Sequence, residues 1–216
     1  MTYKAILFDL DGTLLDSAVH FHSILAQLAS ETNLPAPSLE HVRSWASNGA
    51  AVMIEKCLKV PANSDKHQIL CNRFLELYDI EVHKSCPLFH EVETLLRELS
   101  NKQIPIGIIT NKGRRFYQHI EPQINPIAQI AIGITRDDVS EIKPNPEGLN
   151  ICSNTLSIAN EECLYIGDHQ RDIEAAHNAK MPSAVANWGY LQPGDNPQQW
   201  NATHILNTPS DLLTLL

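Results

Sequence analysis

The sequence predicts an α/β fold: a doubly wound, mostly parallel sheet with an inserted all-helical domain. Short apolar runs alternate with segments of helical spacing along most of the chain, while one long stretch, from about Asp16 to Lys84, has no strand-like run. Strands that alternate with helices form βαβ units and a parallel sheet. The apolar runs are Ala5–Phe8, Ile104–Ile109, Ile130–Ile134, Cys163–Ile166, Ala184–Ala186 and, more weakly, His204–Leu206.

The stretch after the first run is predicted to be helical throughout. Two helical patterns surround residues 52–58 and 69–78, and breakers such as Pro35, Asn48-Gly49 and Pro61 separate the patterns. We therefore expect a helical domain over residues 16–84 and an α/β core domain over residues 1–15 and 85–216. The first helical stripe of the insertion is formed by Phe21, Ile24, Leu25 and Leu28.

The second half of the chain is predicted to alternate helices with strands. Asn145-Pro146-Glu147 combines a cap, a first-turn proline and a first-turn acid, and Thr208-Pro209 predicts the start of the last helix in the same way. Right-handed crossovers then bring the carboxyl ends of the strands to one edge of the sheet, where ligands bind. The helix before the second strand has its apolar positions at Val92, Leu95, Leu96 and Leu99.

Composition excludes several function classes. The net charge of −9 and the lack of a Lys/Arg cluster argue against a nucleic-acid binder. No stretch approaches the roughly 18 apolar residues of a membrane span, and Asp9 and Asp11 interrupt the N-terminal apolar run at once, which argues against a signal peptide. The five cysteines are scattered and are expected to be free thiols in a reducing compartment. We expect a cytoplasmic protein.

Asp9 and Asp11 are the most informative residues, because they directly follow the apolar run Ala5–Phe8 and precede Gly12. Two carboxylates at the end of a buried strand repel each other, and their apolar neighbours penalise the charge. Such a site is usually relieved by a bound cation and used for chemistry. Taken alone, the Asp11-Gly12 pair would also fit an ordinary hairpin turn.

Three further polar clusters follow later apolar runs. Thr110-Asn111 comes after the second run, Lys143 lies in the loop after the third, and Gly167-Asp168 with Asp172 follows the fourth. In a doubly wound sheet these places converge with Asp9 and Asp11. Together they supply carboxylates, a hydroxyl with a backbone donor, and one cation. These groups are the parts needed to bind Mg²⁺ and a phosphoryl group at once.

This pattern resembles the haloacid dehalogenase-like superfamily, whose phosphatases carry D-x-D-G-T, a strand-end Ser or Thr, a Lys and G-D-x-x-x-D. The resemblance spans nearly the whole chain and implies a Mg²⁺-dependent phosphomonoester hydrolase that forms an aspartyl-phosphate. It implies that Asp9 is the nucleophile and that Asp11 protonates the leaving alcohol and then deprotonates water. Dehalogenases of the superfamily lack an acid at the position of Asp11, so that activity is not expected.

The resemblance also implies a set of metal ligands. Asp168 would bind Mg²⁺ directly, together with the side chain of Asp9 and the backbone carbonyl of Asp11. Asp172 would act through water or orient the other ligands. Between these carboxylates, Arg171 is expected to be solvated or salt-bridged, and His169 to lie near the metal and face solvent.

The phosphoryl group has its own implied ligands. Gly12 would let the backbone approach the phosphoryl oxygens, and Thr110 would donate its hydroxyl beside the Asn111 N–H. Lys143 would neutralise charge on the phosphoryl oxygens and on the nucleophile. Thr13 is expected to be structural.

Two plainer interpretations stay open for these residues. Thr110 could cap the following helix, because threonine caps well. Lys143 could instead pair at the surface with Asp138 or Glu141, which are close to it in sequence.

The helical insertion resembles the small cap of this superfamily, which closes over the site and excludes water. Substrate-selecting residues are expected between residues 43 and 50. In this segment Asn48-Gly49 would form a tight turn, and Arg43 would meet a carboxylate of the substrate. The alternative for Arg43 is a solvated helix residue.

Two resemblances concern the substrate. The segment around Asn48-Gly49-Ala50 is similar to phosphoglycolate phosphatases. The C-terminal segment, with Trp188-Gly189-Tyr190, residues 193–197 and Trp200, is similar to N-acetylmuramic acid 6-phosphate phosphatases of cell-wall recycling. Considered together, they favour the muramyl sugar phosphate. Both substrates carry a carboxylate, so Arg43 would not distinguish between them.

Two other functions are disfavoured. A β-phosphoglucomutase needs a second phosphate site in the cap, where paired basic residues are few. A non-catalytic phosphosugar-binding module would be expected to have lost Asp9, Asp11 or Asp168, and all three are present. We expect a monomer or weak homodimer that binds a small phosphate ester and neither nucleic acid nor membrane.

Overall fold

A computed structural model describes residues 3–85 and 87–216 of the chain, so Cys86 lies outside the described residues. The core is one six-stranded sheet in the order β3-β2-β1-β4-β5-β6, and every neighbouring pair of strands is parallel. The predicted α/β fold is confirmed. The strands are β1 (Ala5–Phe8), β2 (Ile106–Ile109), β3 (Ile132–Ile134), β4 (Cys163–Gly167), β5 (Ser183–Ala186) and β6 (His204–Leu206).

The strand order places β1 at the centre, between β2 and β4. The chain builds outward from β1 to β3 on one side and from β4 to β6 on the other. Such a reversal of strand order opens a crevice at the carboxyl edge of the sheet. Asp9 directly follows β1 there, and its N–H donates to the carbonyl oxygen of Ile166 in β4 at 2.8 Å.

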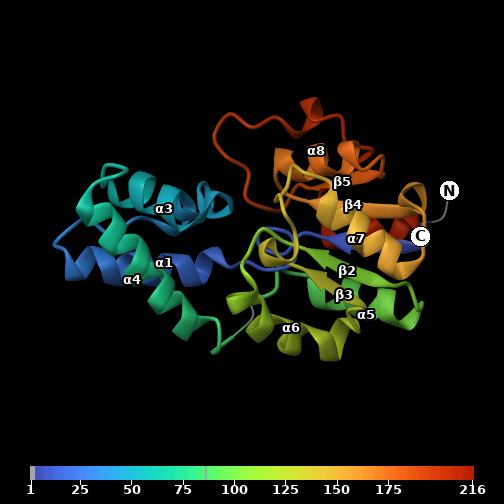
Figure 1. Ribbon diagram of the computed structural model, residues 1–216, viewed down its shortest axis with the longest axis horizontal. Coiled ribbons are helices and arrows are strands. Elements are labelled where there is room, and N and C mark those ends of the chain that lie inside the picture. The colour runs from blue at the N-terminus through green and yellow to red at the C-terminus, as the bar shows by residue number, and fades with distance from the viewer. Residues whose placement is uncertain (1–2, 86) are drawn as a thin grey trace.

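Helices cover both faces of the sheet (Figure 1). Alternate residues of β1 point to opposite faces. Ile6 and Phe8 join the core under α5 (Val92–Asn101) and α6 (Arg114–Ala128). Ala5 and Leu7 join the core under α7 (Glu147–Leu156) and α8 (Gln170–Asn178). Because both faces are covered, all four residues of β1 are fully buried, which explains its unbroken apolar sequence.

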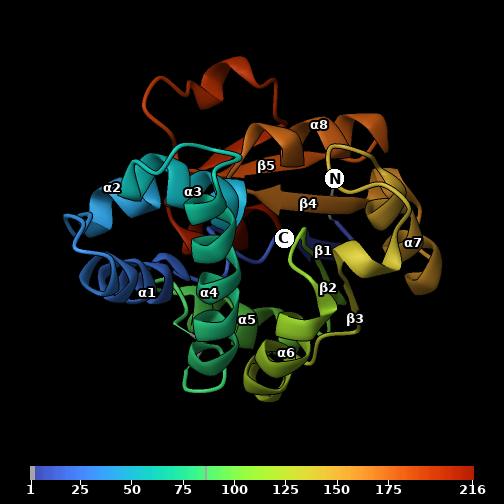
Figure 2. The same cartoon turned by 60° about the vertical axis from the view of Figure 1, so that its left-hand side comes forward.

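Residues 18–81 form helices and contain no strand, as the sequence predicts. We call residues 16–84 the helical insertion; its domain boundaries stay a prediction. Figures 1 and 2 show its helices gathered beside one end of the core. Its elements are α1 (Ala18–Glu31), α2 (Leu39–Arg43), the 3₁₀ turn η1 (Ala46–Asn48), α3 (Gly49–Leu58) and α4 (Asp65–Glu81).

The helical insertion has an aromatic core of its own. The ring of Phe21 in α1 lies 5.7 Å from that of Phe74 and 5.1 Å from that of Tyr78, both in α4. Its two connections to the core run side by side: Leu15 pairs with Leu88 in an antiparallel bridge, and the Asp16 N–H donates to the Pro87 carbonyl oxygen at 2.7 Å. The two chain segments that connect the insertion to the core therefore form one narrow, paired hinge.

Several local predictions can be compared with the elements observed. The side chain of Asn145 accepts the Glu147 N–H at the start of α7, as its capping pattern suggests. The last helix, by contrast, is a 3₁₀ helix, η5 (Pro209–Leu215), which Thr208 and Asp211 cap. Among the described residues, no helix is both long and apolar enough to cross a membrane. Cys57, Cys71, Cys152 and Cys163 are free thiols.

Candidate active site

The carboxyl edge of the sheet brings the four predicted clusters together: residues of the first three line one pocket of about 290 Å³, and Asp168 and Asp172 of the fourth lie next to Asp9. Asp9 follows β1, Thr110 follows β2, Lys143 lies in the loop after β3, and Asp168 follows β4. The helical insertion forms the opposite wall. The lining includes Asp9, Asp11, Thr110, Asn111, Lys112, Arg136, Lys143 and Arg171 from the core, and Phe21, Ala46, Ser47, Asn48, Gly49, Ala50, Met53, Phe74, Leu75 and Tyr78 from the insertion.

Lys143 is the electrostatic centre of the site. Its side chain is 3% exposed, and its Nζ lies 2.8 Å from Asp9 Oδ1 and 2.7 Å from Asp172 Oδ1. It also donates to the Tyr165 hydroxyl at 2.8 Å. The alternative of a surface pair is excluded, because Asp138 pairs with Arg114, and Glu141 accepts from Asn145.

The three buried carboxylates respond differently to this one ammonium group. Burial raises the pKa of Asp9 to about 6, with Lys143 opposing the rise and Asp172 adding to it. At Asp172 burial also acts to raise the pKa, but Lys143 and Arg171 outweigh it and lower the pKa. Asp168 is fully buried, and burial together with the charges of Asp9 and Asp172 raises its pKa to about 8.

The carboxylates of Asp9, Asp168 and Asp172 fit a divalent cation. One oxygen from each lies within 4.8 Å of the others. Within residues 3–85 and 87–216, Asp168 has no cationic partner, although it is fully buried. Hard oxygen ligands of this kind suit Mg²⁺, and a bound cation would offset the uncompensated charge. The residues present therefore fit the metal that the sequence predicts.

Gly12 makes room for Asp168, which differs from the prediction. Its φ is +90°, and a Cβ atom placed on it would lie 2.2 Å from Asp168 Oδ2. Gly12 is buried, is not among the pocket-lining residues, and donates its N–H to the carbonyl oxygen of Leu15 at 2.9 Å. The expected contact between Gly12 and phosphoryl oxygens is therefore wrong. Thr13 is structural, since it donates to Asp168 Oδ1 at 3.4 Å.

Thr110 and Asn111 both line the pocket, as predicted. Helix α6 begins at Arg114 with Gly113 at its cap position, so Thr110 does not cap it. The side chain of Asn111 accepts the Lys143 N–H at 3.1 Å and donates to the Lys143 carbonyl oxygen at 3.3 Å. Asn111 therefore also fixes the backbone from which Lys143 extends.

Asp11 lines the pocket beside a second buried lysine that the sequence analysis missed. Lys112 Nζ lies 2.9 Å from Asp11 Oδ2 and donates to the hydroxyl of Tyr78, in the helical insertion, at 2.8 Å. The other Asp11 oxygen has no hydrogen-bond partner among the described residues. Lys112 directly follows Thr110-Asn111 in sequence, and this proximity to two predicted site residues could have identified it.

Asn48 and Gly49 line the pocket, but Arg43 does not. Arg43 instead pairs with Asp16 at the hinge. The expectation that Arg43 faces the substrate is therefore wrong. Arg43 is close to Asn48 in sequence, but this proximity does not determine the direction of its side chain at the end of α2.

Arg171 differs from its prediction, whereas His169 lies beside Asp172, whose Oδ2 accepts the His169 N–H at 3.1 Å. Arg171 is half-buried, lines the pocket and donates to the backbone oxygen of Ser47 in the helical insertion, and it forms no ion pair among the described residues. Its Nε is buried and has no partner in the described part of the chain. His169 is half-buried, is absent from the pocket lining and caps α8, where its Nδ1 accepts the Arg171 N–H at 3.2 Å.

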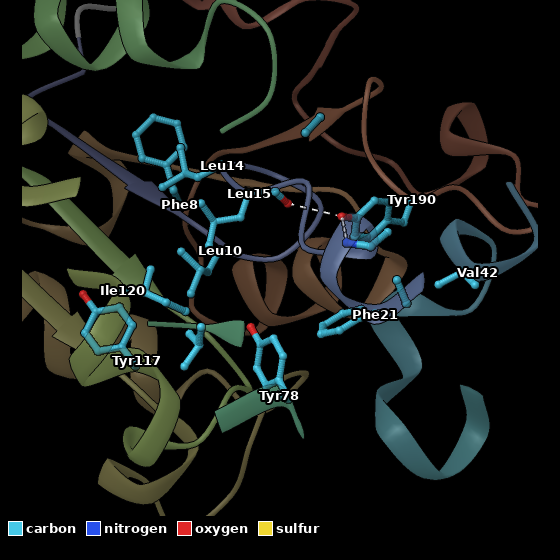
Figure 3. Close-up of a cluster of buried hydrophobic side chains, with 14 of the residues drawn as sticks. Phe8, Leu10, Leu14, Leu15, Phe21, Val42, Tyr78, Tyr117, Ile120 and Tyr190 are labelled. Carbon is cyan, nitrogen blue, oxygen red and sulfur yellow. Dashed lines mark hydrogen bonds between the residues drawn. The ribbon is translucent and has the colours of Figure 1, made fainter. Parts of the chain in front are cut away.

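Trp188 and Tyr190, in the C-terminal segment, form hydrogen bonds with Thr13 and Asp168 at the site. Tyr190 donates its N–H to Asp168 Oδ2 at 2.9 Å, and Trp188 donates its indole N–H to the Thr13 carbonyl oxygen. The Tyr190 hydroxyl accepts the Ala18 N–H at 2.8 Å and contacts the Leu15 carbonyl oxygen at the hinge (Figure 3). Tyr190 thus links the Asp168 carboxylate to the start of the helical insertion.

Comparisons with known proteins agree on a single family. Residues 6–186 match the family model described as haloacid dehalogenase-like hydrolase. An N-acetylmuramic acid 6-phosphate phosphatase of Pseudomonas putida is 34% identical, covering 98% of this chain and 95% of its own. A phosphoglycolate phosphatase of Xanthomonas campestris is 35% identical to this chain, and the matched region covers 97% of this chain and 94% of the relative. A crystal structure of a predicted phosphoglycolate phosphatase from Haemophilus somnus matches with a TM-score of 0.84 at 24% identity. The match covers 100% of this chain and 98% of that structure's chain.

Removing the charge of Asp168 should stabilise the metal-free protein, and increasingly so at higher pH. The pKa of Asp168 is about 8 in the folded state, above the value of about 3.9 expected for an unfolded chain. Between these values the folded state binds more protons, so the contribution of Asp168 to stability falls as pH rises. The melting temperature of Asp168→Asn should therefore be higher than that of the wild type, and the difference should grow from about pH 5 to about pH 8.

Thermal melts of both proteins in chelator, repeated with Mg²⁺, measure that margin. Mg²⁺ should raise the melting temperature of the wild type and have little effect on Asp168→Asn. The exposed Asp65, at the start of α4, offers the matched control Asp65→Asn. A constant margin for Asp168→Asn would contradict the electrostatic description of the site.

Proposed function

The chain belongs to the haloacid dehalogenase-like hydrolases and is a phosphatase, and from this we propose that it hydrolyses phosphate monoesters through a phosphorylated Asp9, with N-acetylmuramic acid 6-phosphate as its preferred substrate. The observation that carries the proposal is the contact of one buried ammonium, Lys143 Nζ, with both Asp9 and Asp172, in a pocket that Thr110 and Asp11 also line. A nucleophile, a cation, a hydroxyl donor and a second carboxylate are thereby gathered around one small volume.

In the first half of the proposed reaction, a carboxylate oxygen of Asp9 attacks the phosphorus atom. A bond forms between that oxygen and phosphorus, and the bond from phosphorus to the ester oxygen breaks. Asp11 gives its proton to the departing oxygen, so the product leaves as an alcohol. Lys143 holds Asp9 Oδ1, which leaves the second oxygen of the same carboxylate to attack.

In the second half, Asp11 has become a carboxylate and takes a proton from water. The water oxygen attacks phosphorus, and the bond between Asp9 and phosphorus breaks, which releases phosphate and restores both carboxyl groups. Lys112 contacts one Asp11 oxygen and so orients this carboxylate in the pocket. Thr110, at the end of β2, would donate its hydroxyl to a phosphoryl oxygen, with the Asn111 N–H beside it.

Mg²⁺ would be held by Asp9 and Asp168, with the Asp11 backbone carbonyl as a further ligand and Asp172 orienting the group. When bound, it would neutralise negative charge on the phosphoryl group and on the carboxylates. Asp168 suits this role because Thr13 and Tyr190 hold its two oxygens in place.

The pocket favours an ester with apolar groups. Phe21, Met53, Phe74 and Tyr78 of the helical insertion and Phe116 of α6 line it. Its volume of about 290 Å³ lies near the lower end of the roughly 300–1,000 Å³ usual for small-molecule sites. The methyl groups of N-acetylmuramic acid could contact such a wall. Glycolate offers only one methylene group.

Phosphoglycolate is the second candidate substrate. Relatives that carry the name phosphoglycolate phosphatase are as similar to this chain as those named for the muramyl sugar. A mutase is disfavoured, because none of the described residues that the helical insertion contributes to the pocket lining is a lysine or arginine that could bind a second phosphate.

We further propose that the protein works in the cytoplasm, in peptidoglycan recycling, as a monomer or weak homodimer. The net charge of −9 disfavours a nucleic-acid partner, and no helix among the described residues could span a membrane.

Parallel assays of phosphate release with Mg²⁺ test the substrate. N-acetylmuramic acid 6-phosphate should exceed 2-phosphoglycolate at least about tenfold in kcat/KM, a factor that corresponds to about 1.4 kcal/mol of binding in the transition state. Asp9→Asn is the blank and should lose activity on both. If 2-phosphoglycolate is preferred, the substrate proposal is wrong; if Asp9→Asn keeps full activity, the nucleophile is wrong.

The role of Asp11 is tested by changing the leaving group. Asp11→Asn should lower kcat/KM for an alkyl phosphate by about 10²- to 10⁴-fold, the usual contribution of general acid catalysis. The loss should be much smaller for p-nitrophenyl phosphate, because p-nitrophenolate departs without a proton. Asp65→Asn, at an exposed site, is the control. An equal loss for both esters would rule out Asp11 as the acid.

A further inference from the structure

Arg136 stands apart from the other arginines of the chain. Of the seven arginines, six donate to an acceptor within the protein, whereas the side chain of Arg136 has none among residues 3–85 and 87–216. The six pairs are Arg43 with Asp16, Arg73 with Glu31 and Glu76, Arg97 with Glu93, Arg114 with Asp138, Arg115 with Asp79, and Arg171 with the Ser47 backbone oxygen.

The lack of a partner is notable because two carboxylates directly follow Arg136. Both are already engaged: Asp137 accepts the Arg114 N–H at 2.6 Å, and Asp138 pairs with the Arg114 guanidinium and accepts the Thr135 N–H at 2.7 Å. Asp138 caps the 3₁₀ turn η2 (Arg136–Asp138) and Asp137 binds the start of α6, which leaves the Arg136 guanidinium available.

Arg136 also lies where a substrate would meet it. It follows β3 at the carboxyl edge of the sheet and is exposed at the pocket that Asp9 and Thr110 line. Its backbone N–H donates to the carbonyl oxygen of Lys112 at 3.3 Å, so its position is tied to the loop that presents Thr110.

Each of the other cations that line the pocket has at least one protein acceptor. Lys143 contacts Asp9 and Asp172, Lys112 contacts Asp11 and Tyr78, and Arg171 donates to the helical insertion. Within the described chain, Arg136 is the one pocket-lining cation whose side chain has no protein acceptor. A second anionic group on the substrate would find its partner there.

We propose that Arg136 is the specificity-determining residue that binds a carboxylate of the substrate and so selects phosphate esters that carry one. This inference rests on the proposed function, in which both candidate substrates have a carboxylate. A guanidinium can hold a carboxylate through two parallel hydrogen bonds, which fixes orientation as well as charge. Arg136 thereby takes the role that the sequence suggested for Arg43.

The test compares esters that differ in the carboxylate. Wild type and Arg136→Gln are assayed on N-acetylmuramic acid 6-phosphate and on N-acetylglucosamine 6-phosphate, which lacks the lactyl group, and likewise on 2-phosphoglycolate and ethyl phosphate. Arg136→Gln should lower kcat/KM for the carboxylate esters about 10- to 100-fold, as expected for losing a charged hydrogen-bonded pair. It should change kcat/KM for the other esters less than about twofold, and Arg136→Lys should retain part of the preference.

Arg43→Gln is the matched control, since Arg43 pairs with Asp16 outside the pocket lining. It should leave the ratio between paired esters unchanged. A carboxylate preference that survives in Arg136→Gln overturns this inference alone, as does an equal loss on both members of each pair. Hydrolysis of neither carboxylate ester by the wild type overturns the proposed substrates together with the inference.

Discussion

The shared ion pair of Lys143 with Asp9 and Asp172 is the interaction on which the rest of the site depends. A buried carboxylate is costly unless it is paired, and three of them lie within 4.8 Å here. Burial raises the pKa of Asp9 to about 6 and that of Asp168 to about 8, and one ammonium group offsets only part of the negative charge. A divalent cation would supply the remaining positive charge and bring the same carboxylates into use for phosphoryl transfer.

The fold maintains this arrangement from several directions. The parallel sheet sets the strand ends side by side, and Asn111 fixes the backbone of Lys143. Behind Asp168, Tyr190 and the space left by Gly12 position the carboxylate. Tyr190 also bonds to the hinge, while Lys112 and Arg171 reach across the pocket to the helical insertion. The position of the insertion is thus linked to the chemical groups through a small number of hydrogen bonds.

The sequence predicted the parts that local chemistry determines. Apolar runs located all six strands, and polar residues at their ends identified Asp9, Thr110, Lys143 and Asp168 as neighbours. It could not predict contacts that depend on how the insertion meets the core. Arg43 was placed wrongly because its partner, Asp16, lies at the hinge, and Lys112 was overlooked because its role arises from the distant Asp11 and Tyr78. The segment around Trp188 and Tyr190 carried a substrate resemblance in sequence, yet these two residues contact Thr13, Asp168 and the hinge.

The most direct test of the account is to identify the residue that becomes phosphorylated during turnover. The enzyme would be mixed with substrate and Mg²⁺, quenched in acid within milliseconds and digested, and the phosphorylated peptide located by mass spectrometry. We expect one acid-stable, base-labile phosphoryl group on Asp9, absent from Asp9→Asn. A phosphoryl group on another residue would contradict it, as would turnover of the substrate with no phosphorylated protein at any quench time.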